Sequence, residues 1–364
     1  MNRPTRPNSP QAEPTGQPTS PVPFPLDYEE DVDGPVWRKE LDPFLPPRLF
    51  DVHSHIFLRE HRPLGRAESA DPSQPTVCEA FPLDNYRRSL AGLFPGRELR
   101  ALLFGTVDAE TDTGASNRYV SQSARAAGLE ALLVVRPGGS ASQLEDELRE
   151  GNFLGCKPYW TFVRGKRPEE ITLADMIDQP MRAVADRLGL LLMVHIPRPG
   201  RLADPVNVAG LETLCRECPR AKVILAHFGR AYFPEALGDL GRLPRLENLY
   251  VDCSMVQDAE VLAVAFREFS VSRILFGLDM PVAQEKGKVL GINGQRHFFT
   301  KRVHPWSIHN SAKSYRIRCT FMAYEMVRAL KKAMARVGLG PEAAEKVFYD
   351  NAAGLVQAVK ERSR

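Results

Sequence analysis

The sequence predicts an α/β fold, a (β/α)8 TIM barrel, and three features predict it. From residue 47 onward, short apolar runs alternate with segments of helical periodicity. The runs are almost continuously apolar, which is typical of parallel strands covered on both faces. Eight such runs occur in a chain of 364 residues, which easily holds the roughly 250 residues of such a barrel. A doubly wound open sheet is the alternative architecture.

The predicted elements follow one another in strand–helix order. The predicted strands are residues 49–53, 101–106, 131–135, 153–157, 190–195, 222–227, 248–252 and 274–278. The clearest predicted helices between them are residues 83–93, 115–127, 142–150, 173–188, 207–217 and 259–269. Additional C-terminal helices are predicted at 311–337, 341–348 and 352–360.

Three segments lie outside this repeat. Residues 1–28 are rich in proline and small polar residues, so we expect a disordered N-terminal tail. Residues 29–46 are acidic and then Pro-rich, which predicts an extended lead-in to a single barrel domain over 47–364. Residues 281–310 have no clear periodicity and are long for a connection in such a barrel, so they predict a lid or substrate loop.

Composition limits the classes of partner. The chain has 48 basic and 45 acidic residues, a net charge of only +3, which gives no case for a nucleic-acid or membrane partner. No apolar run approaches the roughly 20 residues of a membrane span, and no signal peptide is recognisable, so we expect a cytoplasmic protein. Cys215 and Cys218 form a C-x-x-C without a second pair, which favours a structural role over a zinc site.

The first predicted strand carries the clearest chemical signal. It ends in His53-Ser54-His55, and because side chains on a strand alternate, both histidines face the same side. Two imidazoles at this spacing can bind one metal ion. In a barrel, the reacting groups lie at the C-terminal ends of the strands, which is where these two stand.

Other strand ends carry titratable residues as well. Lys157, His195 and His227 end the fourth, fifth and sixth predicted strands, and Asp279 directly follows the eighth. A single histidine at a strand end is more often a hydrogen-bonded structural residue. However, four of the eight histidines of the chain stand at strand ends, and this coincidence favours a shared metal site.

Together these motifs resemble the amidohydrolase superfamily, and most closely its amidohydrolase-2 branch. This branch includes enzymes similar to aminocarboxymuconate-semialdehyde decarboxylase. The resemblance rests on the His-x-His, on His195, on the Ala-His-Phe-Gly at His227 and on the Gly-Leu-Asp-Met-Pro at Asp279. It covers roughly residues 47–357.

The resemblance implies a role for each residue. His53, His55, His195 and Asp279 are then metal ligands, and Asp279 also takes a proton from metal-bound water. His227 is the catalytic histidine that polarises or protonates the substrate. Imidazole-rich ligation favours zinc, with manganese or iron as alternatives.

The number of ions depends on Lys157. One ion is favoured over two. In binuclear branches of the superfamily a carboxylated lysine bridges two ions, and Lys157 would take that role with His227 as a ligand of the second ion. The simpler alternative is a contact from Lys157 to the substrate or to a nearby carboxylate.

The substrate is expected to be small and anionic. Arg198 and Arg230 stand just beyond two strand ends, and arginine binds carboxylates in a bidentate manner. A salt bridge at the rim is the alternative for both. Tyr159 and Trp160 follow Lys157 and predict an aromatic wall, with core packing as the alternative.

Two reactions fit these residues. The first is hydrolysis, in which metal-bound water attacks an amide, ester or lactone carbon. The alternative is non-oxidative decarboxylation of an aromatic or unsaturated carboxylic acid. A catalytically inactive barrel that only binds is disfavoured because the ligand set is complete. A homodimer is expected only from the general prevalence of two-fold symmetry.

Overall fold

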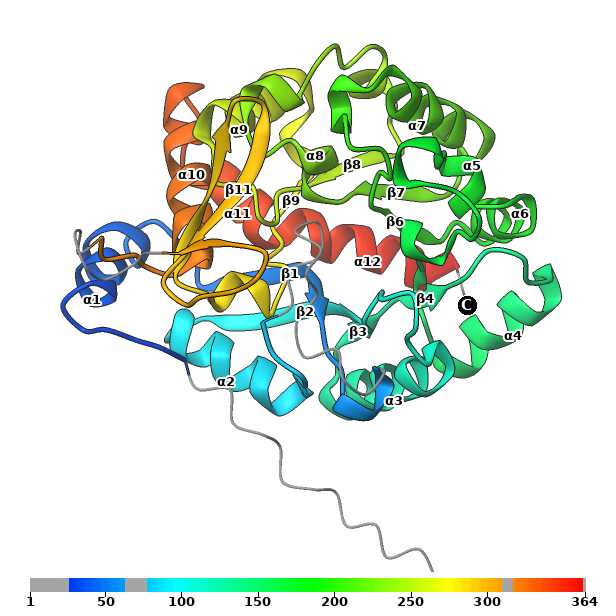
Figure 1. Cartoon of the computed structure of the whole chain (residues 1–364), viewed down its shortest axis with the longest axis horizontal. Helices are drawn as coiled ribbons and strands as arrows, with labels where there is room; N and C mark the ends of the chain where they lie inside the picture. Colours follow the sequence, from blue (N-terminus) through cyan, green and yellow to red (C-terminus); the bar gives the residue numbers. More distant parts are fainter. Residues whose placement is uncertain (1–25, 63–76, 310–316, 363–364) are drawn as a thin grey trace, which may run out of the picture.

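The computed structural model describes residues 26–62, 77–309 and 317–362. Its centre is a ring of short parallel strands surrounded by helices (Figure 1). The strands are β1 (Arg48–His55), β2 (Glu98–Phe104), β3 (Glu130–Ala131), β4 (Leu133–Val135), β5 (Gly155–Pro158), β6 (Leu191–Val194), β7 (Lys222–Leu225), β8 (Leu249–Asp252) and β9 (Ile274–Leu275). The third predicted strand corresponds to β3 and β4 together.

The sheet closes into a barrel. Strands β1, β2 and β3 pair in parallel in that order, and the six strands from β4 to β9 do the same. Beyond β9 the chain returns to β1: Val52 N–H donates to the Phe276 carbonyl at 3.0 Å, and Ser54 forms a parallel bridge with Met280. The predicted TIM barrel is therefore confirmed, and the open sheet is excluded.

The buried carboxylate of Asp51 strengthens this closure. It accepts hydrogen bonds from the backbone N–H of His53 on its own strand and from that of Leu278 after β9, at 3.0 and 2.9 Å. The hydroxyls of Ser54 and Tyr86 donate to its other oxygen. Burial raises the pKa of Asp51 to about 7, against the effect of these four donors.

Helices cover the barrel in the predicted order. The longer ones are α2 (Leu83–Leu93), α3 (Thr113–Ala127), α4 (Ala141–Gly151), α6 (Gln179–Leu188), α7 (Pro205–Glu217), α9 (Ala259–Glu268), α10 (Met322–Arg336) and α12 (Asn351–Arg362). The short ones are α1 (Asp33–Val36), α5 (Leu173–Met176), α8 (His227–Arg230) and α11 (Pro341–Glu345). Among the described residues, no helix has the length and apolar character that crossing a bilayer requires.

Local sequence explains where these helices begin and end. The helix predicted over 173–188 is divided into α5 and α6 because the Asp178 side chain accepts the Met181 N–H and caps a new helix. Gly189, with a φ of 65°, ends α6 in the left-handed conformation that glycine tolerates best. Helix α12 lies across one end of the barrel and adds Ala352, Leu355 and Val356 to its interior core (Figure 1).

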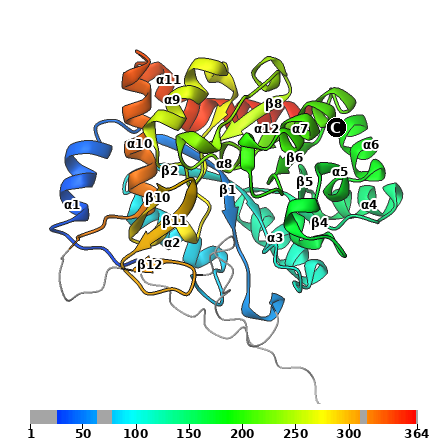
Figure 2. The same cartoon turned by 45° about the horizontal axis from the view of Figure 1, so that its top comes forward.

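The segment 29–46 differs from the prediction. We expected an extended lead-in, but α1 and a following π-helical turn (Trp37–Leu41) occupy it. Trp37 and Leu41 are buried, and the Trp37 ring stacks on Tyr324 of α10 with 6.1 Å between ring centres. Figure 2 shows α1 beside α10. The expected disorder concerns residues 1–28, of which only 26–28 are described, so it stays a prediction.

The segment 281–310 also differs. Instead of an irregular loop, β10 (Gly287–Ile292) and β11 (Gln295–Thr300) form an antiparallel hairpin, to which β12 (Ile308–His309) adds. Its turn is Asn293-Gly294, both with positive φ, as two-residue hairpin turns require. The helix predicted over 311–337 begins only at Met322, and residues 310–316 lie outside the described part of the chain.

Buried charges connect the N-terminal segment to this hairpin. Lys286, which is 2% exposed, places its Nζ 2.7 Å from Asp33 Oδ2 and 2.9 Å from Glu29 Oε1. Asp33 is fully buried and also accepts the Thr320 hydroxyl at 2.7 Å. Removing one member of such a buried pair leaves the other uncompensated.

Replacing Asp33 with alanine should therefore destabilise the fold by about 3 kcal/mol, because Lys286 loses the fully buried one of its two carboxylate partners. Urea unfolding monitored by circular dichroism measures the change. Asp31→Ala is the matched control, since Asp31 is exposed and, within the described ranges, its ion pair is with Arg318 at the surface. Equal unfolding midpoints for the two variants would contradict the importance of the buried pair.

Candidate metal centre

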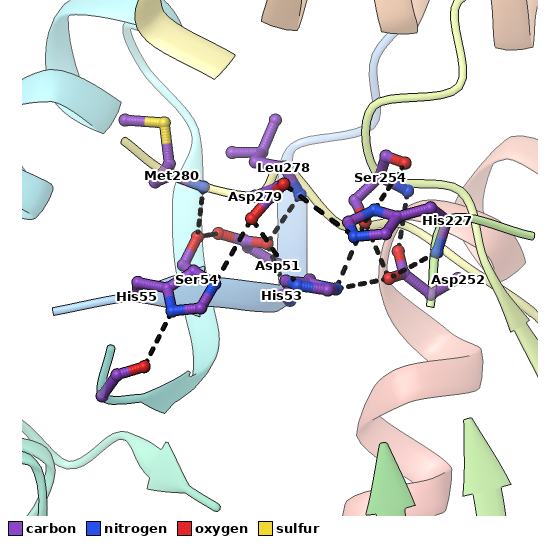
Figure 3. A network of polar contacts seen from close by, with 11 residues as sticks. Asp51, His53, Ser54, His55, His227, Asp252, Ser254, Leu278, Asp279 and Met280 are labelled. Carbon is purple, nitrogen blue, oxygen red and sulfur yellow. Dashed lines mark hydrogen bonds and ion pairs between the residues drawn. The ribbon is translucent and has the colours of Figure 1, made fainter. Parts of the chain in front are cut away.

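Three histidines and one aspartate meet at the C-terminal ends of the strands. Asp279 Oδ1 lies 3.6 Å from His53 Nε2 and 3.4 Å from His55 Nε2. Its other oxygen lies 3.9 Å from His227 Nε2. Figure 3 shows these four side chains converging from β1, from the end of β7 and from the segment after β9.

Hydrogen bonds fix which ring nitrogen of each histidine faces the centre. His53 Nδ1 lies 2.6 Å from Asp252 Oδ2, and His55 Nδ1 lies 2.7 Å from the Gly105 carbonyl. Since a carboxylate and a carbonyl only accept, both Nδ1 atoms carry the proton. Each Nε2 therefore presents its lone pair toward Asp279, the orientation that metal ligation requires.

His227 is oriented in the same way. Its Nδ1 lies 3.1 Å from the Ser254 carbonyl and 2.8 Å from the Ser254 hydroxyl oxygen. Its backbone φ of 55° is in the left-handed region, as is the φ of 65° at Asp279. Such strained backbone in non-glycine residues is found preferentially at functional sites.

Asp252 supports this arrangement from behind. It is fully buried at the end of β8, and besides His53 it accepts the Ser254 N–H at 2.7 Å and the Ser254 hydroxyl at 2.7 Å. Burial raises the pKa of Asp252, but His53 and the other donors outweigh burial and hold it below its usual value. Gly277 makes this packing possible, because a Cβ there would lie 2.5 Å from Asp252 Oδ1.

The sequence analysis missed Asp252 and Ser254. The signal for Asp252 was its place at the end of the seventh predicted strand. The contact to His53 spans 199 residues of sequence, and no local pattern indicates it.

The charges of the site suit a cation. Burial lowers the pKa of His227 to about 3, and it also lowers the pKa values of His53 and His195, so all three are neutral at pH 7. Burial alone would raise the pKa of Asp279, but His55, His53 and His227 hold it well below its usual value. Neutral imidazoles and an ionised carboxylate are the forms that bind metal.

Among the described residues, one group has the spacing to bind an ion: His53, His227 and Asp279, whose ligand atoms lie within 4.8 Å of one another. His55 adds a third nitrogen beside Asp279. The donor set of imidazoles and a carboxylate fits a transition-metal ion such as zinc or manganese.

His195 stands slightly apart from the tightest group. Its ring centre is 5.3 Å from that of His227 and 4.7 Å from that of Tyr159. Its Nδ1 is buried and has no hydrogen-bond partner among the described residues. A buried nitrogen of this kind fits a ligand of the centre. The structure therefore places His227, which we expected to be catalytic, nearer to the proposed ligands than His195.

The predicted substrate residues lie in different places. Tyr159 lines a cavity of about 100 Å³ above the centre, and Trp160 stacks on it with 6.0 Å between ring centres but does not line the cavity. Lys157 is fully buried, and its Nζ has no hydrogen-bond partner within the described chain. Burial lowers the pKa of Lys157 to about 8.

The two predicted arginines do not line this cavity. Arg198 Nε donates to Asp204 Oδ2 at 2.7 Å, so the salt bridge that was its alternative role is the one observed. Arg230 is buried, and its Nη1 donates to the carbonyls of Ile196 and Pro197 at 3.2 and 3.1 Å. It therefore holds the loop after β6 in place.

Other residues, which the sequence analysis did not identify, form much of the cavity wall. They are aromatic or cationic and come from the loop after β1, from the segment after α8 and from the hairpin: Phe57, Arg62, Tyr232, Arg296 and Phe298. Arg296 and Phe298 stand on β11, in the segment expected to be a lid or substrate loop.

The chain matches the amidohydrolase-2 family model, described as Amidohydrolase, over residues 50–357. A search of curated proteins finds no match.

Solved structures share the fold at low identity. A 5-carboxyvanillate decarboxylase from Sphingomonas paucimobilis and an amidohydrolase 2 from Bifidobacterium longum subsp. infantis each give a TM-score of 0.52 and 14% identity, over 86% of this chain and 99% of theirs. A 5-carboxyvanillate decarboxylase from Novosphingobium aromaticivorans, with bound manganese and 3-methoxy-4-hydroxy-5-nitrobenzoic acid, gives 0.51 and 12%, over 86% and 97%. At this identity the likeness shows the barrel fold alone.

Asp252→Asn should weaken binding of a divalent ion by about 10- to 100-fold, because the contact that orients His53 loses its charge. Competition with a fluorescent chelator, with zinc and with manganese, measures the affinity. Asp258→Asn is the matched control, since Asp258 only caps α9. Unchanged affinity in Asp252→Asn would show that this carboxylate does not support the centre.

Proposed function

Because the chain belongs to the amidohydrolase-2 family, we propose that it is a metal-dependent decarboxylase of a small aromatic carboxylic acid. Hydrolysis, the reaction placed first from sequence, becomes the second candidate. Both reactions occur in the family. The residues that line the cavity and the similar solved structures therefore decide which reaction we propose.

The lining of the cavity carries the proposal. Four aromatic rings, those of Phe57, Tyr159, Tyr232 and Phe298, surround the space above the His/Asp group, together with the two cations Arg62 and Arg296. Flat rings stack on aromatic side chains, and arginine pairs with carboxylates. An aromatic acid has both a ring that can stack on these aromatic side chains and a carboxylate that can pair with the arginines.

The similar structures support the same choice. Two of the three described above are decarboxylases of 5-carboxyvanillate, and a dihydroxybenzoic acid decarboxylase from Polaromonas has a TM-score of 0.50 at 13% identity. Hydrolysis has less support among them. No feature of the cavity favours a lactone or an amide over an acid.

We assign one divalent ion to His53, His55, His195 and Asp279, the ligands that the family resemblance implies, and this leaves the neighbouring His227 Nε2 free to carry a proton. When bound, such an ion supplies a Lewis acid that orients the carboxylate and stabilises negative charge on the substrate. Zinc was expected from the sequence, but the manganese in two of the similar decarboxylases makes manganese the first ion to test.

In the proposed reaction, the bond between the ring carbon and the carboxylate carbon breaks. CO₂ leaves, its bonding electron pair stays on the ring carbon, and that carbon takes up a proton that originates from water. His227 is the proposed proton carrier, because its Nε2 faces the site while Ser254 holds its Nδ1. A bound carboxylate would raise the pKa of His227 from its low resting value of about 3 and so favour the protonated form.

His227→Gln should lower CO₂ release from hydroxylated benzoic acids by about 100-fold or more, the usual contribution of a positioned acid or base. A coupled CO₂ assay on the manganese-reconstituted protein measures it. His297→Gln is the control, because His297 stands on the hairpin and does not line the cavity. Release of CO₂ by His227→Gln at the wild-type rate would contradict the assigned role.

The same acids, together with a panel of lactones and amides, separate the two reactions. Decarboxylation predicts CO₂ from at least one acid. Hydrolysis of a lactone or amide, with labelled oxygen incorporated from water and no CO₂ from any acid, would instead establish the second candidate.

A further inference from the structure

We propose that the acidic segment 27–33 is a strap that holds the β10–β11 hairpin in place over the cavity, with Glu29 as its central residue. Residues of the hairpin line the cavity, whereas no residue of the strap does so. The strap therefore controls access to the cavity from a distance, whichever reaction takes place there. Glu29 acts through the hairpin, so it is a positioning residue and does not touch the substrate.

The hairpin connects the cavity to the strap. Arg296 and Phe298 of β11 line the cavity. The stem of the hairpin lies at the other end of the two strands, where the Lys301 N–H donates to the Lys286 carbonyl at 2.8 Å. Between the stem and the turn, β10 and β11 pair residue by residue without a break. A stem that is held in place therefore also fixes the position of Arg296 and Phe298.

Glu29 joins both sides of this stem. Its Oε1 lies 2.9 Å from the Nζ of Lys286, directly before β10, and it also contacts the Nζ of Lys301, directly after β11. Its Oε2 lies 3.4 Å from Arg318 Nη2, in the segment that leads to α10. Hydrogen bonds from Lys301 and Lys286 lower the pKa of Glu29 to about 2, so this carboxylate is ionised at neutral pH.

Asp27 and Asp31 add contacts on either side of Glu29. Asp27 Oδ2 lies 2.8 Å from Lys301 Nζ, and Asp31 Oδ2 lies 2.6 Å from Arg318 Nη2. Isolated ion pairs at a surface contribute little to stability, but these pairs share their cations with Glu29. They therefore form a network, which is the arrangement in which surface charges stabilise a structure measurably.

The outer half of the hairpin is its exposed half. Residues 291–295 are exposed, whereas Lys286, Gly287 and Thr300 at the stem are buried. Exposed segments with few buried contacts open most readily by local fluctuation. Loss of the charges at the stem should therefore open the hairpin while the barrel stays folded.

Hydrogen–deuterium exchange tests the proposal. Glu29→Gln removes the central charge of the strap but keeps Asp33, so the buried pair with Lys286 remains. Exchange over residues 287–300 should become about tenfold faster, because contacts to charged groups are lost at the stem. Exchange in the barrel strands should stay at the wild-type rate. Unchanged exchange over residues 287–300 would overturn the inference.

Two further variants show whether the effect belongs to the strap. Glu30→Gln is the matched control, since Glu30 is the next residue and forms its ion pair with Arg38 of the π-helical turn. It should exchange like the wild type. Lys301→Met breaks the contact with Glu29 from the hairpin side, so combining it with Glu29→Gln should give less than the product of the two separate effects. Fully independent effects would contradict the contact.

Cysteine labelling measures access to the cavity directly. Cys78 lines the cavity, whereas Cys253, just after β8, is 1% exposed. With iodoacetamide and peptide mass spectrometry, Glu29→Gln should label Cys78 faster by a factor similar to that of exchange and Cys253 at the wild-type rate. Faster labelling of both cysteines would show that the substitution unfolds the barrel, and it would overturn the assignment of a strap.

Discussion

The closure of the barrel between β1 and the segment after β9 is the contact on which the site depends. The Asp51 carboxylate accepts one N–H from each side, and the Asp279 N–H donates to the His53 carbonyl. These bonds fix the register of the two segments. Because the register is fixed, Asp279 lies against His53 and His55 rather than one residue away from them. The metal centre is thus a consequence of how the barrel closes.

Buried groups behind the histidines orient the rings for metal binding. Asp252 ends β8 and Ser254 follows it, and they hold the protonated nitrogens of His53 and His227 away from the centre. The imidazoles are buried and neutral, and Asp279 is ionised, so the centre favours a cation. The opposite wall, around Arg296 and Tyr232, carries positive charge. The cavity therefore has a cation-binding centre on one side and positive charge on the other. This arrangement suits an anionic ligand that contacts both sides.

Sequence reasoning identified the strand framework and the residues at its ends, since apolar runs and side-chain alternation are local properties. Both histidines of the first strand face Asp279, as alternation predicted. Asp252, Tyr232 and Arg296 were not predicted from the sequence, because their roles depend on contacts between distant segments. The Asn293-Gly294 turn was a local hairpin signal that was overlooked. The helix at Asp33–Leu41 could not be predicted from its Pro-rich surroundings, because burial against α10 stabilises it.

The most direct test of the central claim is the anomalous scattering of manganese in crystals of the protein grown with that ion. We expect one peak at the barrel mouth, within coordination distance of His53 Nε2, His55 Nε2 and Asp279 and outside coordination distance of His227 Nε2. Two peaks bridged by a carboxylated Lys157 would contradict the single-ion centre. A peak elsewhere, with these side chains unchanged, would contradict the centre itself.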